Sequence, residues 1–214
     1  HVTTDEIEIM RESKCKMVHN PVSNLKLGSG IAPLREIVDA GISVGLGTDN
    51  TSCNDSINMF ETMKFAATIH KISTCNYEKW IGAEDAFKMA TIGGAACALM
   101  ADEIGKIEIG RKADIVIIDV NNYEYVPSSN LLNSMVFCDR GNRVKHVIID
   151  GVIVVENGNI KTFDEKGVMS EIKNLLPKIM KENKRARIEI APYLENIRKA
   201  YMKACLEFEL QNCK

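Results

Sequence analysis

The chain has 214 residues, of which 45% are hydrophobic and 26% are charged, and its formal net charge is −2 at pH 7. This balance is typical of a globular protein of one or two domains, and it gives no electrostatic reason to expect nucleic acid or an anionic membrane as a partner. The apolar runs are only a few residues long, too short to span a bilayer. The cysteines, seven in number and without a Cys-x-x-Cys pair, favour a reducing, cytoplasmic setting over disulfides or a thiolate zinc site.

The chain opens on His1, and a capping-box pattern at Thr3 and Glu6 predicts a helix over residues 3–13. This helix would feed the first of only two parallel strands, so the sheet would lack its other neighbours. We therefore expect the chain to be the C-terminal half of a longer protein.

Two short apolar runs, residues 16–18 and 42–46, predict buried strands. A loop over residues 20–30 and a helix beginning at Pro33 separate them, with Leu34, Ile37 and Val38 on its buried face and Gly41 as its stop. A helix between two apolar runs favours a parallel pair with a right-handed crossover.

Asp49 follows the second run and His19 follows the first. The carboxyl ends of parallel strands meet at one edge, where α/β proteins place their active sites. Asp49 is therefore a candidate functional carboxylate, although Asp is also common as a helix N-cap or turn residue. His19 is a candidate pocket residue or, equally, a hydrogen-bonded core histidine. His70 and His146 are most simply structural or solvated.

The rest of the chain changes from helical to strand patterning near Gly105. Helices are predicted over 55–71 and 83–89, with a break at 91–94 before a further helix over 95–100. Core positions of the first of these are Ile57, Phe60, Met63, Ala67 and Ile69. Antiparallel strands are predicted over 115–120, 144–149, 152–155 and 160–163, with turns at Asp150-Gly151 and near Asn157. A charged helical tail follows from residue 165, and its basic run over 181–187 is most simply a solvated helix face.

Two segments carry a resemblance to a known family. HNPVSNLKLGSGIAPLREIVDAGISVGLGTDN (19–50) resembles the end of the barrel in metal-dependent amidohydrolases, in the branch that deaminates S-adenosylhomocysteine and 5′-methylthioadenosine. AEDAFKMATIGGAACALMADEIGKIEIGRKADIVIIDV (83–120) resembles the passage from that barrel to a small β domain. The resemblance implies an α/β fold: the C-terminal part of a (β/α)8 TIM barrel over 1–104, returning strands of a small β-sandwich domain over 105–163, and a helical tail over 164–214.

The resemblance also implies the roles of particular residues. Asp49 matches the aspartate that binds the metal and relays a proton, so it is both the metal ligand and the catalytic residue that we expect. Gly45 and Gly47 would leave backbone room beside one divalent metal ion, for which zinc is the expected identity. His19 is not a metal ligand in the family's pattern, and we expect it to line the substrate pocket or to orient Asp49 or the substrate. His1 receives no assigned chemistry. The other metal ligands and acid-base groups would lie outside this chain, so this piece alone should be inactive.

The expected function is metal-dependent hydrolytic deamination of an adenine nucleoside, such as S-adenosylhomocysteine, 5′-methylthioadenosine or a related purine nucleoside. The N-terminal half of the same protein is the expected partner. Alternatives are another amidohydrolase, of the guanine deaminase or triazine chlorohydrolase type, and a catalytically silent barrel scaffold. The long tail helix is also compatible with a homo-oligomer.

Overall fold

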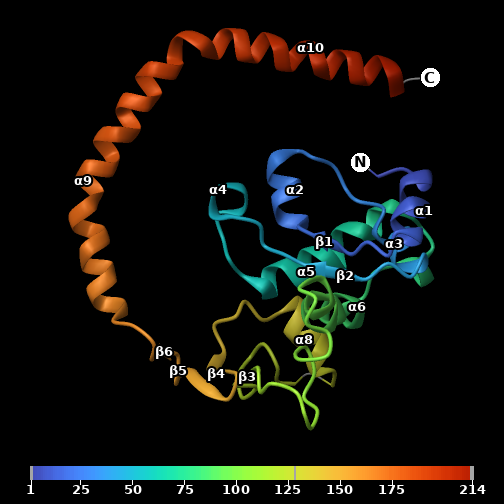
Figure 1. Ribbon diagram of the computed structural model, residues 1–214, viewed down its shortest axis with the longest axis vertical. Coiled ribbons are helices and arrows are strands. Elements are labelled where there is room, and N and C mark those ends of the chain that lie inside the picture. The colour runs from blue at the N-terminus through green and yellow to red at the C-terminus, as the bar shows by residue number, and fades with distance from the viewer. Residues whose placement is uncertain (1, 128, 213–214) are drawn as a thin grey trace. The chain divides into compact units, whose positions relative to one another are not determined.

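The computed structural model describes residues 2–127 and 129–212 (Figure 1). The chain divides into two compact units, His1–Thr162 and Phe163–Lys214. The first unit holds every described strand and the shorter helices, and the second consists of two long helices. Among the described residues, no helix is both long and apolar enough to cross a membrane.

The first helix forms where its capping pattern predicts it. α1 spans Thr4–Glu12, and the Thr3 hydroxyl accepts a hydrogen bond from the backbone N–H of Glu6. The Glu6 carboxylate in turn accepts the backbone N–H of Thr3 at 2.7 Å. These reciprocal bonds satisfy donors that a helix N-terminus would otherwise leave free. On the inner side of the helix, Ile7 enters the core.

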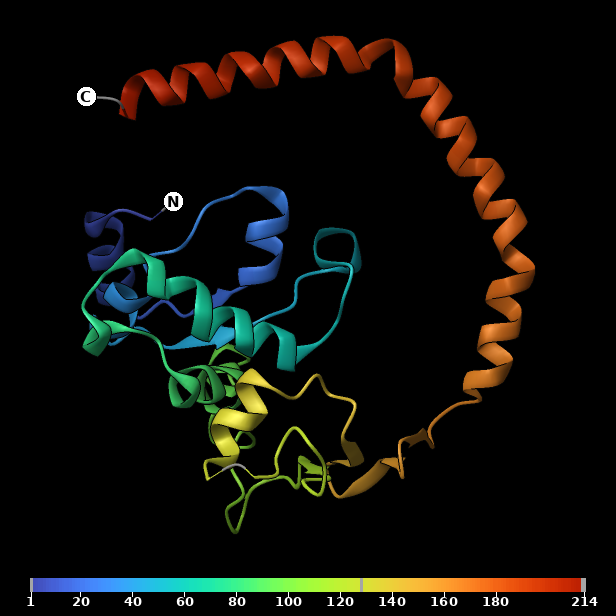
Figure 2. The ribbon, with the colours of Figure 1, turned by 180° about the vertical axis from the view of Figure 1, so that it is seen from behind.

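The centre of the first unit is a parallel pair of strands, β1 (Met17–His19) and β2 (Val44–Leu46). All of β2 is buried because three elements pack against it: α5 (Met59–Ile69), the π-helical turn η3 (Met89–Gly93) and α7 (Gly94–Cys97). The strand pair and α5 lie together in both views (Figures 1 and 2). The predicted parallel pair is confirmed, although His19 is the last residue of its strand rather than the first of a loop.

Two helices connect β1 to β2, α2 (Pro21–Leu27) and α3 (Leu34–Asp39). The predicted loop over 20–30 is therefore wrong over most of its length. Pro21 stands in the first turn of α2, where a missing N–H costs nothing, and Gly28 ends the helix with a left-handed φ of 65°. The prediction for α3 is confirmed, since Leu34 and Ile37 are fully buried.

The helix predicted from residue 55 begins later, at Met59. A short helix, α4 (Thr51–Asn54), is followed by Asp55 in the left-handed conformation with φ 64°, which separates it from α5. The side chain of Asn58 caps α5 by accepting the N–H groups of Phe60 and Glu61. Ile57 is consequently outside the helix and 73% exposed, so its predicted core position is wrong. Met63 and Ala67 are buried as predicted.

The helix that starts at Ala83 does not break at residues 91–94. It runs through α6 (Ala83–Lys88), the π-turn η3 and α7 without leaving helical backbone. A Cβ added to Gly93 would lie 2.0 Å from the carbonyl oxygen of Val44. The glycines predicted to break the helix thus allow close packing on β2 instead. Two short 3₁₀ turns, η1 (His70–Ser73) and η2 (Tyr77–Lys79), join α5 to α6.

Four antiparallel strands form a second sheet in chain order, β3 (Ile115–Ile118), β4 (Val144–Ile149), β5 (Val152–Glu156) and β6 (Asn159–Ile160). Both predicted turns have two successive residues with positive φ, 48° and 79° at Asp150-Gly151 and 49° and 75° at Asn157-Gly158. That pattern matches the twist of hairpin strands. The antiparallel prediction is confirmed, with shorter first and last strands than expected.

A helix that the sequence did not predict, α8 (Leu131–Phe137), packs against α5 and α6. Beside it, the hydroxyl of Tyr125 donates to the carboxylate of Asp139 at 2.6 Å, and both side chains are only 2% exposed. Burial, with the adjacent Asp139 carboxylate, raises the pKa of Tyr125. This bond joins the loop after β3 to the end of α8.

The second unit contains α9 (Glu165–Ile190), the turn η4 (Ala191–Tyr193) and α10 (Leu194–Asn212). The basic run over 181–187 is exposed along its whole length, as predicted for a solvated face. Apolar side chains are exposed as well: Leu175, Leu176, Ile179, Ile197, Tyr201 and Leu206.

Candidate metal and substrate site

Asp49 lies just beyond the C-terminal end of β2, with its side chain exposed. Its backbone is left-handed, with φ 58°. Non-glycine residues seldom adopt this conformation, and where they do the surrounding structure must hold it. The position is the one at which parallel α/β folds carry their chemistry.

Two hydrogen bonds hold the Asp49 carboxylate, one on each oxygen. The Ser23 hydroxyl on α2 donates to Oδ2 at 2.7 Å, and the backbone N–H of Asn50 donates to Oδ1 at 2.8 Å. The Ser23 bond and then the Asn50 bond lower the pKa of Asp49 below its ordinary value. The carboxylate is therefore ionised and oriented at neutral pH.

The helix-cap role that the sequence left open for Asp49 belongs to its neighbour. The side-chain oxygen of Asn50 accepts the backbone N–H groups of Ser52 and Cys53, both at 3.0 Å. These bonds cap α4. Among the described residues, no backbone N–H of α4 donates to the Asp49 carboxylate, which bonds instead to the Ser23 hydroxyl and to the Cys53 side chain.

The space predicted beside Gly45 and Gly47 is filled by the chain itself, so that expectation is wrong. A Cβ added to Gly47 would lie 2.3 Å from Oδ1 of Asn20, the residue that precedes α2. A Cβ added to Gly45 would lie 3.1 Å from Sγ of Cys97 and from Cα of Gly94. These glycines allow α2 and α7 to approach β2 closely, which places Ser23 within reach of Asp49.

His19 is almost fully buried and forms a hydrogen bond with His70. His70 is the residue that follows the C-terminal end of α5. Their Nε2 atoms lie 2.9 Å apart, and the two side chains are 2% and 5% exposed. One ring must donate its Nε2 proton and the other must accept it, so the accepting ring is neutral when the bond exists. Of the two roles predicted for His70, structural or solvated, the buried hydrogen bond that joins β1 to η1 supports the structural one.

Burial dominates the acid-base behaviour of this pair. It lowers the pKa of His19 to about 4, with the neighbouring His70 adding to the effect. It lowers the pKa of His70 to about 4 as well, although the charge of Glu36 opposes the shift. Desolvation disfavours the charged form of a buried histidine, so the neutral pair persists well below neutral pH.

Three buried polar atoms near this end of the sheet have no hydrogen-bond partner among the described residues. They are Nδ1 of His19, Oδ1 of Asn20 and Oδ1 of Asn54. The amide of Asn54 does donate to the carbonyl of Thr48 at 2.6 Å. Buried polar atoms normally find a partner, so these atoms indicate where polar groups from outside the described residues would be accommodated.

The described residues contain no group of three or more His, Cys, Asp or Glu side chains that could hold a metal ion. Asp49 nevertheless fits the part of a single ligand. Its carboxylate is ionised, exposed and held by two donors, and carboxylate oxygen is an accepted zinc ligand whose orientation depends on such partners. Asp49 could therefore serve as a metal ligand only together with ligands from outside the described residues.

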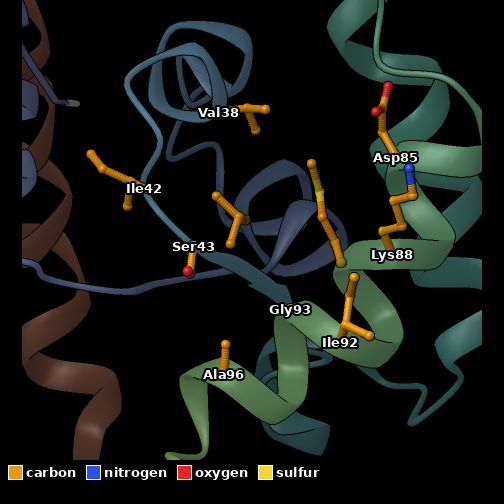
Figure 3. Close-up of a pocket in the computed structure, with 10 residues that line it drawn as sticks. Val38, Ile42, Ser43, Asp85, Lys88, Ile92, Gly93 and Ala96 are labelled. Carbon is orange, nitrogen blue, oxygen red and sulfur yellow. The ribbon is translucent and has the colours of Figure 1, made fainter. Parts of the chain in front are cut away.

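A cavity of about 300 Å³ opens near the other end of β2 (Figure 3). Its walls are largely aliphatic, and Val38 and Ile42 face Asp85 and Lys88 across it. This cavity lies at the N-terminal end of β2, beside Ile42 and Ser43, whereas Asp49 lies beyond the C-terminal end of the strand. It therefore does not belong to the candidate site, and we assign it no chemistry.

The sequence indicated Asp49 and His19 but missed Ser23 and the pairing role of His70. Ser23 lies in the predicted loop, and only the pattern of Pro21 followed by Gly28 could have suggested a short helix there. No sequence signal links His70 to a residue 51 positions earlier. His146 lies half-buried on β4, away from these residues in the chain, and His1 is outside the described residues.

Parallel strands joined by helices, with an ionised carboxylate beyond the carboxyl end of one strand, are typical of α/β proteins, the (β/α)8 barrels among them. The amidohydrolase family model matches residues 1–154, and the chain belongs to the amidohydrolase family.

Known relatives agree with that assignment. The chain is 45% identical over 181 residues to a 5-methylthioadenosine/S-adenosylhomocysteine deaminase of Thermoanaerobacter pseudethanolicus, covering 82% of this chain and 42% of the relative. It resembles the crystal structure of an adenosine deaminase from Xanthomonas campestris with bound zinc, with TM-score 0.80, 28% identity and 85% and 41% of the two chains covered. It also resembles zinc-complexed atrazine chlorohydrolase TrzN from Arthrobacter aurescens TC1, with TM-score 0.77, 30% identity and 82% and 39% covered.

The chain thus spans less than half the length of the relatives it matches. These solved structures are barrel enzymes of the same family, and the predicted partial (β/α)8 barrel is confirmed.

Proposed function

We propose that the protein containing this chain hydrolytically deaminates adenine nucleosides such as S-adenosylhomocysteine or 5′-methylthioadenosine. One observation carries the proposal: an ionised Asp49 is fixed at the C-terminal end of β2 within a segment that matches the amidohydrolase family. The deaminase relative at 45% identity supports the substrate class.

Asp49 is proposed as a metal ligand and proton relay. A divalent metal ion, for which zinc is favoured by the zinc-bound relatives, supplies a Lewis acid that activates water near neutral pH. The Asp49 carboxylate accepts a proton at one oxygen during water attack and delivers it to the departing amine. Because the pKa of Asp49 is lowered, the carboxylate is unprotonated at neutral pH and has a free lone pair for that proton.

We propose that the N-terminal half of the same protein completes the barrel and supplies the remaining metal ligands. Within the described residues β1 and β2 pair only with each other, so each has one edge without a strand partner. Val18 on β1 is 52% exposed although it is apolar. Closure of a barrel pairs such edges and covers such side chains.

His19 is proposed as a residue of the substrate pocket wall. Its Nε2 atom is committed to His70, but its Nδ1 atom has no partner among the described residues. That atom can interact with a polar group of the substrate or of the N-terminal half. Burial would keep the ring neutral, and the bond to His70 would fix its orientation.

Two further expectations stay predictions. The prediction of a cytoplasmic location rests on the isolated cysteines, because free thiols persist in a reducing compartment. The cysteines among the described residues are free thiols. A homo-oligomer rests on the exposed apolar side chains of α9 and α10, such as Leu175 and Tyr201.

Other chemistry within the family is the main alternative. A triazine chlorohydrolase is less favoured because its identity to this chain is 30%, against 45% for the nucleoside deaminase. A guanine deaminase would share the metal chemistry and differ in the purine accepted. A silent scaffold would keep the barrel and lack metal.

The test is ammonia release by the full-length protein on S-adenosylhomocysteine, 5′-methylthioadenosine, guanine and a chlorinated triazine, with chloride release followed for the last. Deamination of an adenine nucleoside with bound metal supports the proposal. Activity on guanine alone would instead support a guanine deaminase, and activity on the triazine alone would support a triazine chlorohydrolase. A folded protein without metal or activity would support the scaffold.

A further inference from the structure

The bond between Ser23 and Asp49 joins two parts of the chain that are 26 residues apart. The remaining partners of the Asp49 carboxylate among the described residues, the Asn50 N–H and the Cys53 side chain, lie within the next four residues and therefore move with the loop. Ser23, in contrast, belongs to α2, which packs against both α4 and α5. Its hydroxyl thus provides the connection between the exposed carboxylate and the body of the first unit.

α2 is itself well fixed. Ser23 is 2% exposed and Pro21 is fully buried, so the first turn of the helix is embedded in the structure. Immediately before this turn, Asn20 lies against the α-carbon of Gly47, where no Cβ could fit. The contact between Asn20 and Gly47 therefore sets how closely the start of α2 approaches the loop that carries Asp49.

A second contact lies one helical turn further along α2. Lys26 donates to the backbone carbonyl of Ser52 at 3.1 Å and pairs with Asp55, at the two ends of α4. Residues three apart share a helix face, so Ser23 and Lys26 reach the same loop from the same side of α2. The helix therefore holds the segment from Asp49 to Asp55 at both ends.

We infer that Ser23 is a positioning residue that fixes the Asp49 carboxylate in the orientation needed to bind the metal ion. This inference rests on the proposed function of Asp49. The backbone of Asp49 is left-handed and its side chain is exposed. Without Ser23, the described residues that restrain the carboxylate all belong to its own loop and α4, namely Asn50 through its N–H and Cys53 through its side chain. Hydroxyl or amide partners of a metal ligand orient it in this way, and their loss typically weakens metal affinity or activity about 10- to 100-fold.

The test uses the full-length protein after removal of metal, and zinc affinity is measured by competition with a chelator. Ser23→Ala should weaken zinc binding about 10- to 100-fold and lower kcat with little change in KM. Ser23→Thr keeps the hydroxyl and should recover most of the affinity. Ser29→Ala is the matched control, because Ser29 is exposed just beyond the end of α2 and should bind zinc as the wild type does.

Ser23→Cys guards against a folding defect, because it is close to serine in size but donates only weakly. It should show an intermediate loss of zinc affinity with the wild-type melting temperature. Zinc affinity within twofold of wild type in folded Ser23→Ala and Ser23→Cys would overturn the inference. A wild-type protein that binds zinc but deaminates no nucleoside would refute the proposed function, while the effect of Ser23 on zinc affinity would still decide this inference.

Discussion

The buried pair of His19 and His70 should make the protein sensitive to mild acid. In the folded state both pKa values are lowered to about 4, whereas an unfolded histidine titrates near its ordinary value of about 6.5. The unfolded chain therefore binds more protons between these two values, and stability falls as the pH falls. The contribution of the neutral pair is complete above about pH 6.5 and is lost progressively toward pH 4.

The size of the effect follows from those pKa values. Between pH 7 and pH 5, one histidine with this shift lowers the free energy of unfolding by about 2 kcal/mol, and two that shift equally lower it by up to about 4 kcal/mol. Each ring is at most 5% exposed, so little solvent screening reduces the effect. Protonation of the accepting ring would also remove the 2.9 Å bond, because both Nε2 atoms would then carry protons.

The assay is urea unfolding of the full-length protein, followed by circular dichroism at pH 7, 6 and 5. His70→Gln removes one titrating ring but keeps an amide that can bond to His19, so it should lose only about half as much stability on acidification as the wild type. His146→Gln is the matched control, since it removes a histidine from β4, outside the pair. A wild-type loss below about 0.5 kcal/mol between pH 7 and pH 5 would refute the reasoning, as would a His70→Gln variant that loses as much as the wild type.

Two substitutions test the packing that positions the site. Gly47→Ala should destabilise the protein by about 1 to 3 kcal/mol and reduce zinc binding, because the new Cβ would displace Asn20 and with it α2. Gly94→Ala is the control: its Cβ would meet only ordinary contact at 3.7 Å, so the variant should be tolerated. Chemical denaturation measures the stability of both variants, and competition with a chelator measures their zinc affinity. Tyr125→Phe should lower the free energy of unfolding by about 1 to 3 kcal/mol, because a buried oxygen of Asp139 loses its 2.6 Å partner, and an unchanged urea midpoint would contradict this.

Local patterns predicted much of the fold because the physical causes lie close together in sequence. The Thr3 and Glu6 cap, the two apolar strands and the paired turn residues at Asp150-Gly151 each act within a few residues. Hydrophobic periodicity failed at α2, where the helix is short and polar and depends on Pro21 and on packing against Gly47. It failed again at residues 91–94, where the glycines look like a break and instead allow a π-turn to pack against β2.

The candidate site was predictable only in part. Asp49 follows from its place after a buried strand, whereas its partner Ser23 depends on a tertiary contact across 26 residues. The same holds for His19 and His70, whose bond spans 51 residues. Burial decides the protonation of that pair, and burial cannot be read from isolated histidines in a sequence.

The most direct test of the central claim is ammonia release from S-adenosylhomocysteine and 5′-methylthioadenosine by the full-length protein, wild type beside Asp49→Asn. An amide cannot accept and return the proton that a carboxylate carries, so the account predicts release by the wild type and a loss of at least about 100-fold in the variant, with both proteins folded. A variant that deaminates as fast as the wild type would contradict the role of Asp49.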